Sequence, residues 1–278
     1  TGTVESVPLI TASILSKKFA EGARALVFDV KCGAGAFMKT LEDARTLAQS
    51  LINAGESLGR KIAAVVTDMS EPLGYMVGNF LEVEESVYCL MGSSAPDGFR
   101  MPTDLMEVTI RLAAWMLKLG GVVADVEEGA ATAQKAIDSG DAYERFMTNA
   151  QLQGADPAQV ERDLGTRRAP EQQSITAPAD GWISQIDAYK IGMAGVHLGV
   201  GRNRADESVD PLAGIDLSVK CGDRVHAGDR LCEMHAADAS RLAAAESLAG
   251  AAFVIKDEAP AASDPSSRSD RMILEEHG

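Results

Sequence analysis

The order of hydrophobic and polar positions along the chain predicts a layered α/β structure at its start. Ser6 can cap a helix that runs to about Ala20. Apolar runs at 25–30 and 61–69 predict two buried strands, and residues 40–58 between them have helical periodicity. One face of that predicted helix carries Leu41, Ala44, Leu47, Ala48 and Leu51. This strand–helix–strand alternation predicts a βαβ unit.

Further helices follow, and then the sequence changes from helical periodicity to short β segments. Helical periodicity recurs near residues 77–91, 104–119, 125–138 and 141–153. From Ser174 onward, short β segments alternate with Gly, Pro and Asp turns, before a helix at about 239–249 and a strand at 251–255. The stretch 257–278 is rich in Asp, Ser, Pro and Ala, which predicts a disordered tail. The predicted fold class is therefore α/β: a βαβ-containing mixed-sheet domain with flanking helices, then a C-terminal α+β subdomain.

Composition and charge exclude several classes of protein. The 278 residues carry a formal net charge of -15, which argues against a nucleic-acid surface because such a surface needs clustered Lys and Arg. No apolar run approaches the roughly 20 residues of a membrane span, and no signal-peptide pattern occurs. The scattered positions of Cys32, Cys89, Cys221 and Cys232 predict reduced thiols in a cytoplasmic protein. The chain starts at Thr1 and enters a helix almost at once, so we expect it to be the rear part of a longer protein.

The stretch DVKCGAGAFMKT, residues 29–40, has the layout of a phosphate-binding loop but matches neither common motif. A Walker A loop requires G-x-x-x-x-G-K-[ST], and Met38 stands where its second glycine belongs. A dinucleotide loop requires G-x-G-x-x-G, and Met38 again replaces the last glycine. The residues therefore predict a tight strand-to-helix turn rather than a nucleotide loop.

The first predicted helix places polar groups within an apolar stripe. Ile10, Ser13, Ile14 and Lys17 lie at i, i+3, i+4 and i+7 and so share one face. Burying an unpaired ammonium is costly, so Lys17 must reach water or meet an acceptor. Spacing alone favours a lysine that extends to solvent beside a backbone-bonded serine. The alternative is a pair of donors directed at the carbonyl groups of a ligand.

Three long stretches resemble the thymidine and pyrimidine-nucleoside phosphorylases. They are TVESVPLITASILSKKFAEGARALVFDVKCGAGAFMKT, AVVTDMSEPLGYMVGNFLEVEESV and GVGRNRADESVDPLAGIDLSVKCGDRVHAGDRL, and the likeness runs from Thr1 to about Ile255. Members of this family split a pyrimidine nucleoside with phosphate, giving the free base and a pentose 1-phosphate. The resemblance implies four parts: 1–22 as the remnant of a helical domain, 23–170 as a central α/β domain, 171–256 as a barrel-sandwich-like subdomain, and the tail.

The resemblance also implies which residues hold the base. Ser13 and Lys17 correspond to the family's donors to the polar edge of the pyrimidine, which favours the donor-pair interpretation. Donors at the ring oxygens would stabilise negative charge that develops as the glycosidic bond breaks. The same likeness places Val4, Ile10 and Phe37 as apolar walls around the base.

A potassium site is implied by the same resemblance. Backbone carbonyls of Leu73 and Met76 and the carboxylate of Glu85 match the family's ligands, and hard oxygen donors suit such an ion. The alternative is that Glu85, in the acidic run 82–85, faces solvent. No organic cofactor is expected, and phosphate is expected as co-substrate.

The family's phosphate site is not found in this sequence. Its Lys-His-Ser-x-Gly-Gly run does not occur here, and the histidines all lie in the C-terminal third, at His197, His226, His235 and His277. The family's base-binding arginine would fall before Thr1. We therefore name no catalytic residue and expect the isolated chain to be nearly inactive, whereas the parent is expected to be a homodimeric enzyme of nucleoside salvage.

Other interpretations remain open at this stage. The chain could be a non-catalytic fragment or binding module of the same fold. A biotinyl- or lipoyl-type carrier would need a lysine on an exposed hairpin, and the nearest candidate, Lys190, is predicted to begin a helix. A pentosyl transfer to another acceptor, as in phosphoribosyltransferases of similar architecture, is a third interpretation. Nothing in the residues separates thymidine from uridine.

Overall fold

The computed structural model describes residues 6–202, 204, 206–259 and 272–278. By its internal contacts the chain forms two compact units. The first unit comprises Thr1–Ser70, Asp104–Lys135 and Asp270–Gly278, and the second comprises Glu71–Thr103 and Ala136–Ser269. No helix among the described residues has the length and apolar character needed to cross a membrane.

The first unit is built on the predicted βαβ motif. Helix α1 (Val7–Ala20) precedes strand β1 (Ala25–Cys32), helix α2 (Leu41–Ser57) and strand β2 (Lys61–Asp68). β1 and β2 pair in parallel, and the Thr40 hydroxyl caps α2 by accepting from the Asp43 amide. The prediction of a βαβ unit is confirmed.

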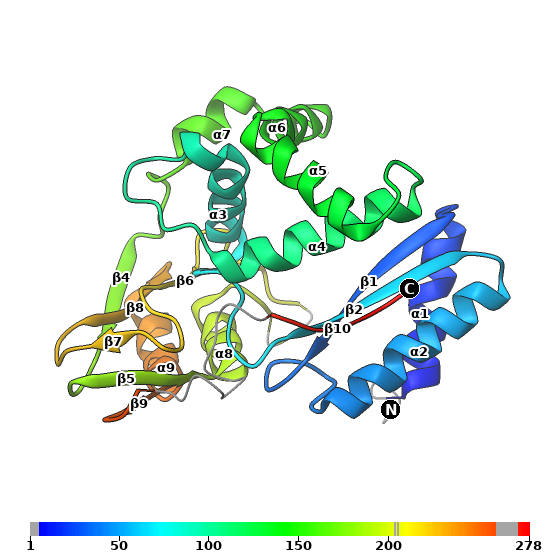
Figure 1. The fold of residues 1–278 in the computed structure, drawn as a ribbon. Helices are drawn as coiled ribbons and strands as arrows, with labels where there is room; N and C mark the ends of the chain where they lie inside the picture. The colour runs from blue at the N-terminus through cyan, green and yellow to red at the C-terminus, as the bar shows by residue number, and fades with distance from the viewer. Residues whose placement is uncertain (1–5, 203, 205, 260–271) are drawn as a thin grey trace. The chain divides into compact units, whose positions relative to one another are not determined.

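Helices cover both faces of this sheet. α1 and α2 bury one face, with Ala44, Leu51 and Val66 in their shared core. The alternate residues Ala63 and Val65 face helix α4 (Thr103–Leu119) and the start of α5 (Val126–Asp138). Figure 1 shows α1 and α2 lying along the side of β1 and β2.

The end of the chain corrects one prediction. Residues 273–277 were expected to belong to a disordered tail, but they form strand β10 (Ile273–His277), antiparallel to β2. The sheet order is β1-β2-β10, so the last strand completes the sheet. It is anchored by an ion pair from Arg45 to Glu275 and by the Trp115 indole, which donates to Glu276 at 3.1 Å. The intervening part of the predicted tail, 260–271, lies outside the described residues.

The second unit combines helices with two small antiparallel sheets. Its helices are α3 (Asn79–Met91), the 3₁₀ turn η1 (Gly92–Ser94), α6 (Asp141–Leu152), α7 (Pro157–Asp163), α8 (Ala188–Leu198) and α9 (Ala239–Gly250). Its strands are β3 (Met76–Val77), β4 (Glu171–Thr176), β5 (Gly181–Ile186), β6 (Gly214–Leu217), β7 (Arg224–Val225), β8 (Arg230–Ala236) and β9 (Phe253–Lys256). They form sheets of order β3-β6-β8-β4 and β7-β5-β9. The second unit thus mixes helices with antiparallel sheets.

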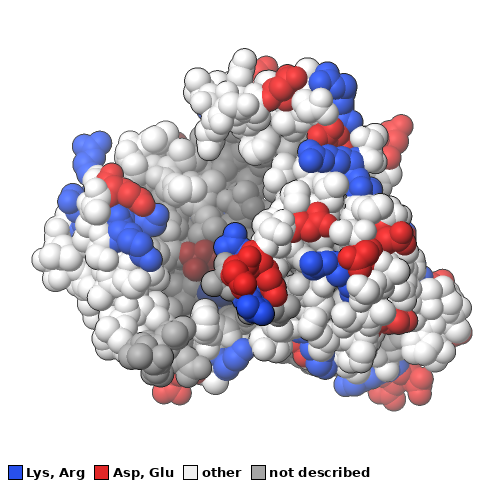
Figure 2. Space-filling view, turned by 180° about the vertical axis from the view of Figure 1, so that it is seen from behind, with Lys and Arg blue, Asp and Glu red and all other residues white. Residues whose placement is uncertain are grey.

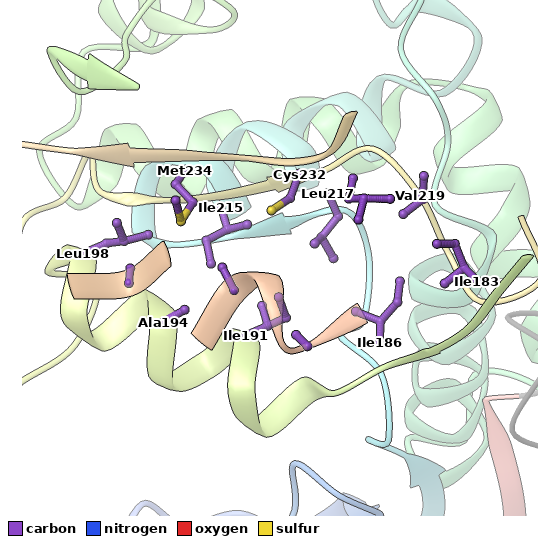
Figure 3. Packing of buried hydrophobic residues seen from close by; sticks show 14 of the residues in the cluster. Ile183, Ile186, Ile191, Ala194, Leu198, Ile215, Leu217, Val219, Cys232 and Met234 are labelled. Carbon is purple, nitrogen blue, oxygen red and sulfur yellow. The ribbon is translucent and has the colours of Figure 1, made fainter. Parts of the chain in front are cut away.

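The core of this unit lies between a sheet and a helix. In Figure 3, Ile191, Ala194 and Leu198 of α8 point toward β6 and β8, where Ile215 and Met234 are fully buried. All four cysteines of the chain are buried and free of disulfides, as predicted. In this core, burial raises the pKa of the Cys232 thiol to about 12, which keeps it neutral.

The two compact units divide the chain differently from the predicted domains, which stay a prediction. A single central domain over 23–170 was expected, yet Glu71–Thr103 belongs to the second unit. The reason is a long-range pairing: β3 is hydrogen-bonded to β6, with Met76 opposite Asp216. α1 is likewise not separate from the α/β layer, because it packs on α2 and the Thr11 hydroxyl lies 2.9 Å from that of Ser50.

Candidate functional site

The first unit contains a pocket of about 570 Å³. Its lining comes from the first turns of α1, from residues 28–31 of β1, from Phe37 and Met38 in the glycine loop, and from the inner face of α2. Most of these side chains are apolar, and polar groups enter from Ser13, Asp29 and Lys31. A largely apolar cavity with a few convergent polar groups is typical of small-molecule sites.

α1 supplies one wall of this pocket and only part of the predicted donor pair. Ile10 and Ser13, which the family resemblance places at the base, line the cavity. Lys17 lies one turn further along α1, is exposed, and is not among the lining residues. Val4 lies outside the described residues. The structure therefore brings Ser13 and Ile10 together at the pocket and leaves Lys17 outside its lining.

The glycine loop also lines the pocket, and the amides of its two glycines are already bonded within the protein. The Gly33 amide donates to the Met38 carbonyl at 3.0 Å, and the Gly35 amide donates to the Met69 carbonyl at 2.8 Å. Gly33 has φ +120°, and a Cβ there would lie 2.5 Å from the Ser70 hydroxyl oxygen. The predicted tight turn is confirmed, and its glycine is required by the approach of Ser70.

The same loop presents one exposed aromatic ring. Both Phe37 and Met38 line the cavity, but Met38 is buried in the core whereas Phe37 is 70 % exposed. An exposed phenyl ring beside a cavity is available to stack on a planar ligand. Phe37 and Ile10, predicted as walls of one site, do lie on one pocket.

Two charged residues of the pocket were not singled out from the sequence. Asp29 and Lys31 stand two positions apart at the carboxyl end of β1, so both project on the same side of the strand. Nζ of Lys31 lies 2.7 Å from Oδ2 of Asp29, and the Thr67 hydroxyl of β2 donates to Oδ1 of Asp29 at 2.5 Å. The available signal was the charged D-x-K pattern at the end of an apolar strand, the edge where ligands bind in parallel sheets.

A thiol near this edge is held in its neutral form. Burial, followed by the neighbouring charge of Asp68, raises the pKa of Cys32. Asp68 itself accepts from the amide and hydroxyl of Ser70 at 2.9 and 2.7 Å. Cys32 is therefore a packing residue at the end of β1 rather than a nucleophile.

The predicted potassium ligands lie in the second unit. Glu85 is only 3 % exposed, so the alternative that it faces solvent is wrong. Its Oε1 accepts from the Tyr75 amide at 2.7 Å, and the carboxylate is packed against Gly74 in the turn that carries Leu73 and Met76. A carboxylate has about four acceptor positions, so a cation ligand is compatible with this arrangement.

A buried lysine reinforces the same turn. Lys220 is 2 % exposed, and its Nζ donates to the Pro72 carbonyl at 2.5 Å. The Cys221 amide donates to Glu71 at 3.2 Å, which ties the turn to the β6–β7 connection. Within the described residues, no group of three or more His, Cys, Asp or Glu side chains is placed to hold a metal ion.

Two family models match the chain. Residues 1–143 match the glycosyl transferase family a/b domain, and residues 182–256 match the pyrimidine nucleoside phosphorylase C-terminal domain. The chain belongs to the thymidine and pyrimidine-nucleoside phosphorylase family. Among similar proteins are the pyrimidine-nucleoside phosphorylases of Staphylococcus aureus strains bovine RF122 / ET3-1, USA300 and NCTC 8325 / PS 47. Each is 40 % identical over 235 residues, which cover 84 % of this chain and 53 % of the relative.

The chain thus spans about half the length of the curated phosphorylases that it matches. No histidine is among the residues that line the pocket of the first unit. His235 is 2 % exposed in the core of the second unit, where burial lowers its pKa and favours the neutral ring. His226 and His277 lie beside Asp229 and Glu275, respectively.

The carrier interpretation loses support. Lys190 lies in α8, and its Nζ donates to the Ala251 carbonyl at 3.0 Å, so it is not on the exposed hairpin that a biotinyl or lipoyl carrier requires. Acidic and basic side chains of the described residues are interspersed on the face drawn in Figure 2, with no broad basic surface there. A nucleic-acid surface would need clustered Lys and Arg on such a face.

Proposed function

We propose that this chain forms the pyrimidine-binding part of an enzyme that transfers a pentose from a pyrimidine nucleoside to phosphate. The observation that carries the proposal is the pocket of the first unit, where Ile10, Ser13 and Phe37 line one cavity. The family membership and the relatives' name, pyrimidine-nucleoside phosphorylase, support the same reaction class. Thymidine and uridine are both within the proposed substrate class.

In the proposed reaction, the bond between the pentose C1′ and the base nitrogen breaks, and its electron pair goes to the base. A phosphate oxygen forms the new bond to C1′, which gives pentose 1-phosphate. Donors on α1, the Ser13 hydroxyl and the Lys17 ammonium, would stabilise the charge that develops on the pyrimidine. Phe37 and Ile10, together with Val4, would form the apolar walls that hold the ring in place.

Several finer features belong to this proposal. Phosphate would be the second substrate, and potassium would be held by Glu85 and the carbonyls of Leu73 and Met76. The full-length parent would act as a cytoplasmic homodimer in nucleoside salvage. Because the 278 residues contain no Lys-His-Ser-x-Gly-Gly run, the isolated chain would release base very slowly, since phosphorolysis needs both substrates held in one site.

A non-catalytic binding module of the same fold is the second candidate. The pocket favours it as much as it favours the enzyme, because base binding alone requires only the groups present in the first unit. Turnover separates the two candidates. Phosphate-dependent release of thymine from thymidine, by a longer protein that includes this chain, supports the enzyme, whereas binding without release supports the module.

Replacing Ser13 by alanine is expected to weaken thymine binding by about threefold to tenfold. A net hydrogen bond contributes about 0.5–1.5 kcal/mol, and 1.4 kcal/mol corresponds to a factor of ten in affinity. Calorimetric titration of the 278-residue chain with thymine measures the change, with hypoxanthine as a purine that the pocket should discriminate against.

Ser16→Ala is the matched control for this experiment. Ser16 is an exposed serine on the same helix, does not line the pocket, and bonds to the Ser13 carbonyl at 3.2 Å. Its replacement should leave thymine affinity unchanged. Equal binding of thymine and hypoxanthine, or equal effects of the two serine substitutions, would contradict the proposed site.

A further inference from the structure

The lysine that lines the pocket lies on β1 rather than on α1. Lys31 is a lining residue, whereas Lys17 is not. β1 is an edge strand of the first unit's sheet, and Lys31 lies next to its carboxyl end, beside the glycine loop that carries Phe37. A ligand that stacks on Phe37 would therefore meet Lys31 at the same edge of the sheet.

Lys31 has unused donor capacity. Its Nζ atom is buried and makes no hydrogen bond among the described residues. Nζ forms an ion pair with Oδ2 of Asp29 at 2.7 Å. An ammonium carries three N–H donors, and buried donors are normally paired. A ligand oxygen in the adjoining cavity would accept a hydrogen bond from the remaining N–H donors of Lys31.

Asp29 is held so that it can fix the position of this ammonium. The Thr67 hydroxyl, fully buried on the neighbouring strand, donates to Oδ1 of Asp29 at 2.5 Å. Thr67 lies opposite Lys31 in the β1–β2 register, so the three side chains share one face of two paired strands. These contacts leave Oδ2 of Asp29 facing the ammonium of Lys31. Because all three residues lie in paired strands, the positions of both charged groups are restrained.

We propose that Lys31, positioned by Asp29 and Thr67, contacts an oxygen of the bound pyrimidine and selects the base in its anionic form. The inference rests on the proposed function and deepens it by naming a further base-contacting residue. An ammonium beside a bound base favours a negatively charged ligand over a neutral ligand of the same shape, and the Asp29 carboxylate in the same lining offsets part of this preference. The base leaves a nucleoside with the electron pair of the broken bond, so the same preference would assist its departure.

The test compares a neutral base with one that is ionised at neutral pH. Thymine and 5-nitrouracil are titrated into the 278-residue chain, and the affinity ratio between them is measured for each variant. Lys31→Met should lower the preference for the 5-nitrouracil anion by about tenfold or more, the factor expected for a charge-assisted hydrogen bond. Lys31→Arg should keep the preference. Lys61→Met, which removes an exposed lysine at the start of the neighbouring strand, should not change it.

The positioning role is tested at Thr67. Thr67→Val removes the hydroxyl at nearly constant shape and should lower the preference for the anion by about threefold, the loss of a modest hydrogen bond. Thr67→Ser keeps the hydroxyl and should restore the preference. Thermal unfolding of every variant shows whether the fold is kept.

The outcomes separate the two proposals. Failure of both bases to bind the unchanged chain overturns the proposed function itself. Binding of both bases, with the preference for the anion intact in Lys31→Met, overturns only the role of Lys31. Loss of affinity for both bases in equal measure, with a lowered unfolding temperature, makes Lys31 a structural residue and overturns the inference as well.

Discussion

Replacing Glu84 by alanine is expected to lower the free energy of unfolding of the second unit by about 3 kcal/mol or more. The Glu84 side chain is 2 % exposed and accepts from both terminal nitrogens of Arg168, at 2.6 and 3.1 Å. It also accepts from the Gly165 amide. Removing the carboxylate leaves a partly buried guanidinium and a backbone donor without their acceptor, while α3 loses its tie to the segment before β4.

Urea unfolding followed by tryptophan fluorescence measures this effect. The chain has two tryptophans, and Trp182 lies in the second unit, so a Trp115→Phe background isolates its signal. Glu246→Ala is the matched control, because Glu246 is an exposed carboxylate on α9 in the same unit. It should change stability by no more than about 0.5 kcal/mol. Similar losses in the two variants would show that the buried ion pair is not what holds α3.

Replacing Gly78 by alanine is expected to destabilise the second unit by about 3 kcal/mol. Gly78 has φ +136°, where an L side chain is strained, and its Cβ would lie 2.4 Å from the Ala213 carbonyl oxygen. Gly214 opposite has the same restriction, since a Cβ there would lie 2.4 Å from the Val77 carbonyl oxygen. The two glycines let β3 approach β6, and this contact fixes the turn that carries the proposed potassium ligands.

Gly192→Ala is the control, and its expected change in stability has the opposite sign. Gly192 is an exposed residue within α8, and a Cβ there meets nothing within 4 Å. Alanine should raise stability by about 0.5–1 kcal/mol, because it restricts the unfolded chain and suits a helix interior. A neutral effect of Gly78→Ala in the same urea experiment would mean that β3 and β6 do not pair as closely as described.

Local patterns in the sequence were enough to predict the βαβ unit. The apolar runs of β1 and β2 and the period of Ala44 to Leu51 each follow from neighbouring residues. The pairing of β3 with β6 could not be predicted in this way, because it joins residues about 140 positions apart and β3 is only two residues long. Because of that pairing, Glu71–Thr103 groups with the second unit rather than with the rest of the predicted central domain.

Strand β10 is a second element that local sequence patterns did not predict. Residues 272–277 are a short apolar run followed by charges, and they lie next to a stretch with the composition of a tail. They form a strand because the free edge of β2 accepts them, with Ile273 packing toward α4. Edge pairing is a tertiary effect, and it outweighs a weak local preference.

The candidate site was predicted only where its residues lie on one helix face. Spacing placed Ser13 and Ile10 on one face of α1, and the resemblance to the family supplied their proposed roles and that of Phe37. Lys17 shares the face of Ser13 in projection, yet one turn of helix places it about 6 Å further along the axis, outside the pocket lining. Lys31 could not be chosen from the sequence, since its role depends on Thr67 from a different strand.

The most direct test of the account is to map where thymine contacts the chain. Amide ¹H–¹⁵N shifts of the labelled 278-residue protein would be followed during titration with thymine and, separately, with hypoxanthine. The account predicts that thymine shifts residues near Ser13, residues 28–31 and Phe37, and that hypoxanthine produces much smaller changes at the same residues. Thymine shifts confined to the second unit, or absent at saturating base, would contradict the claim that this pocket holds the pyrimidine.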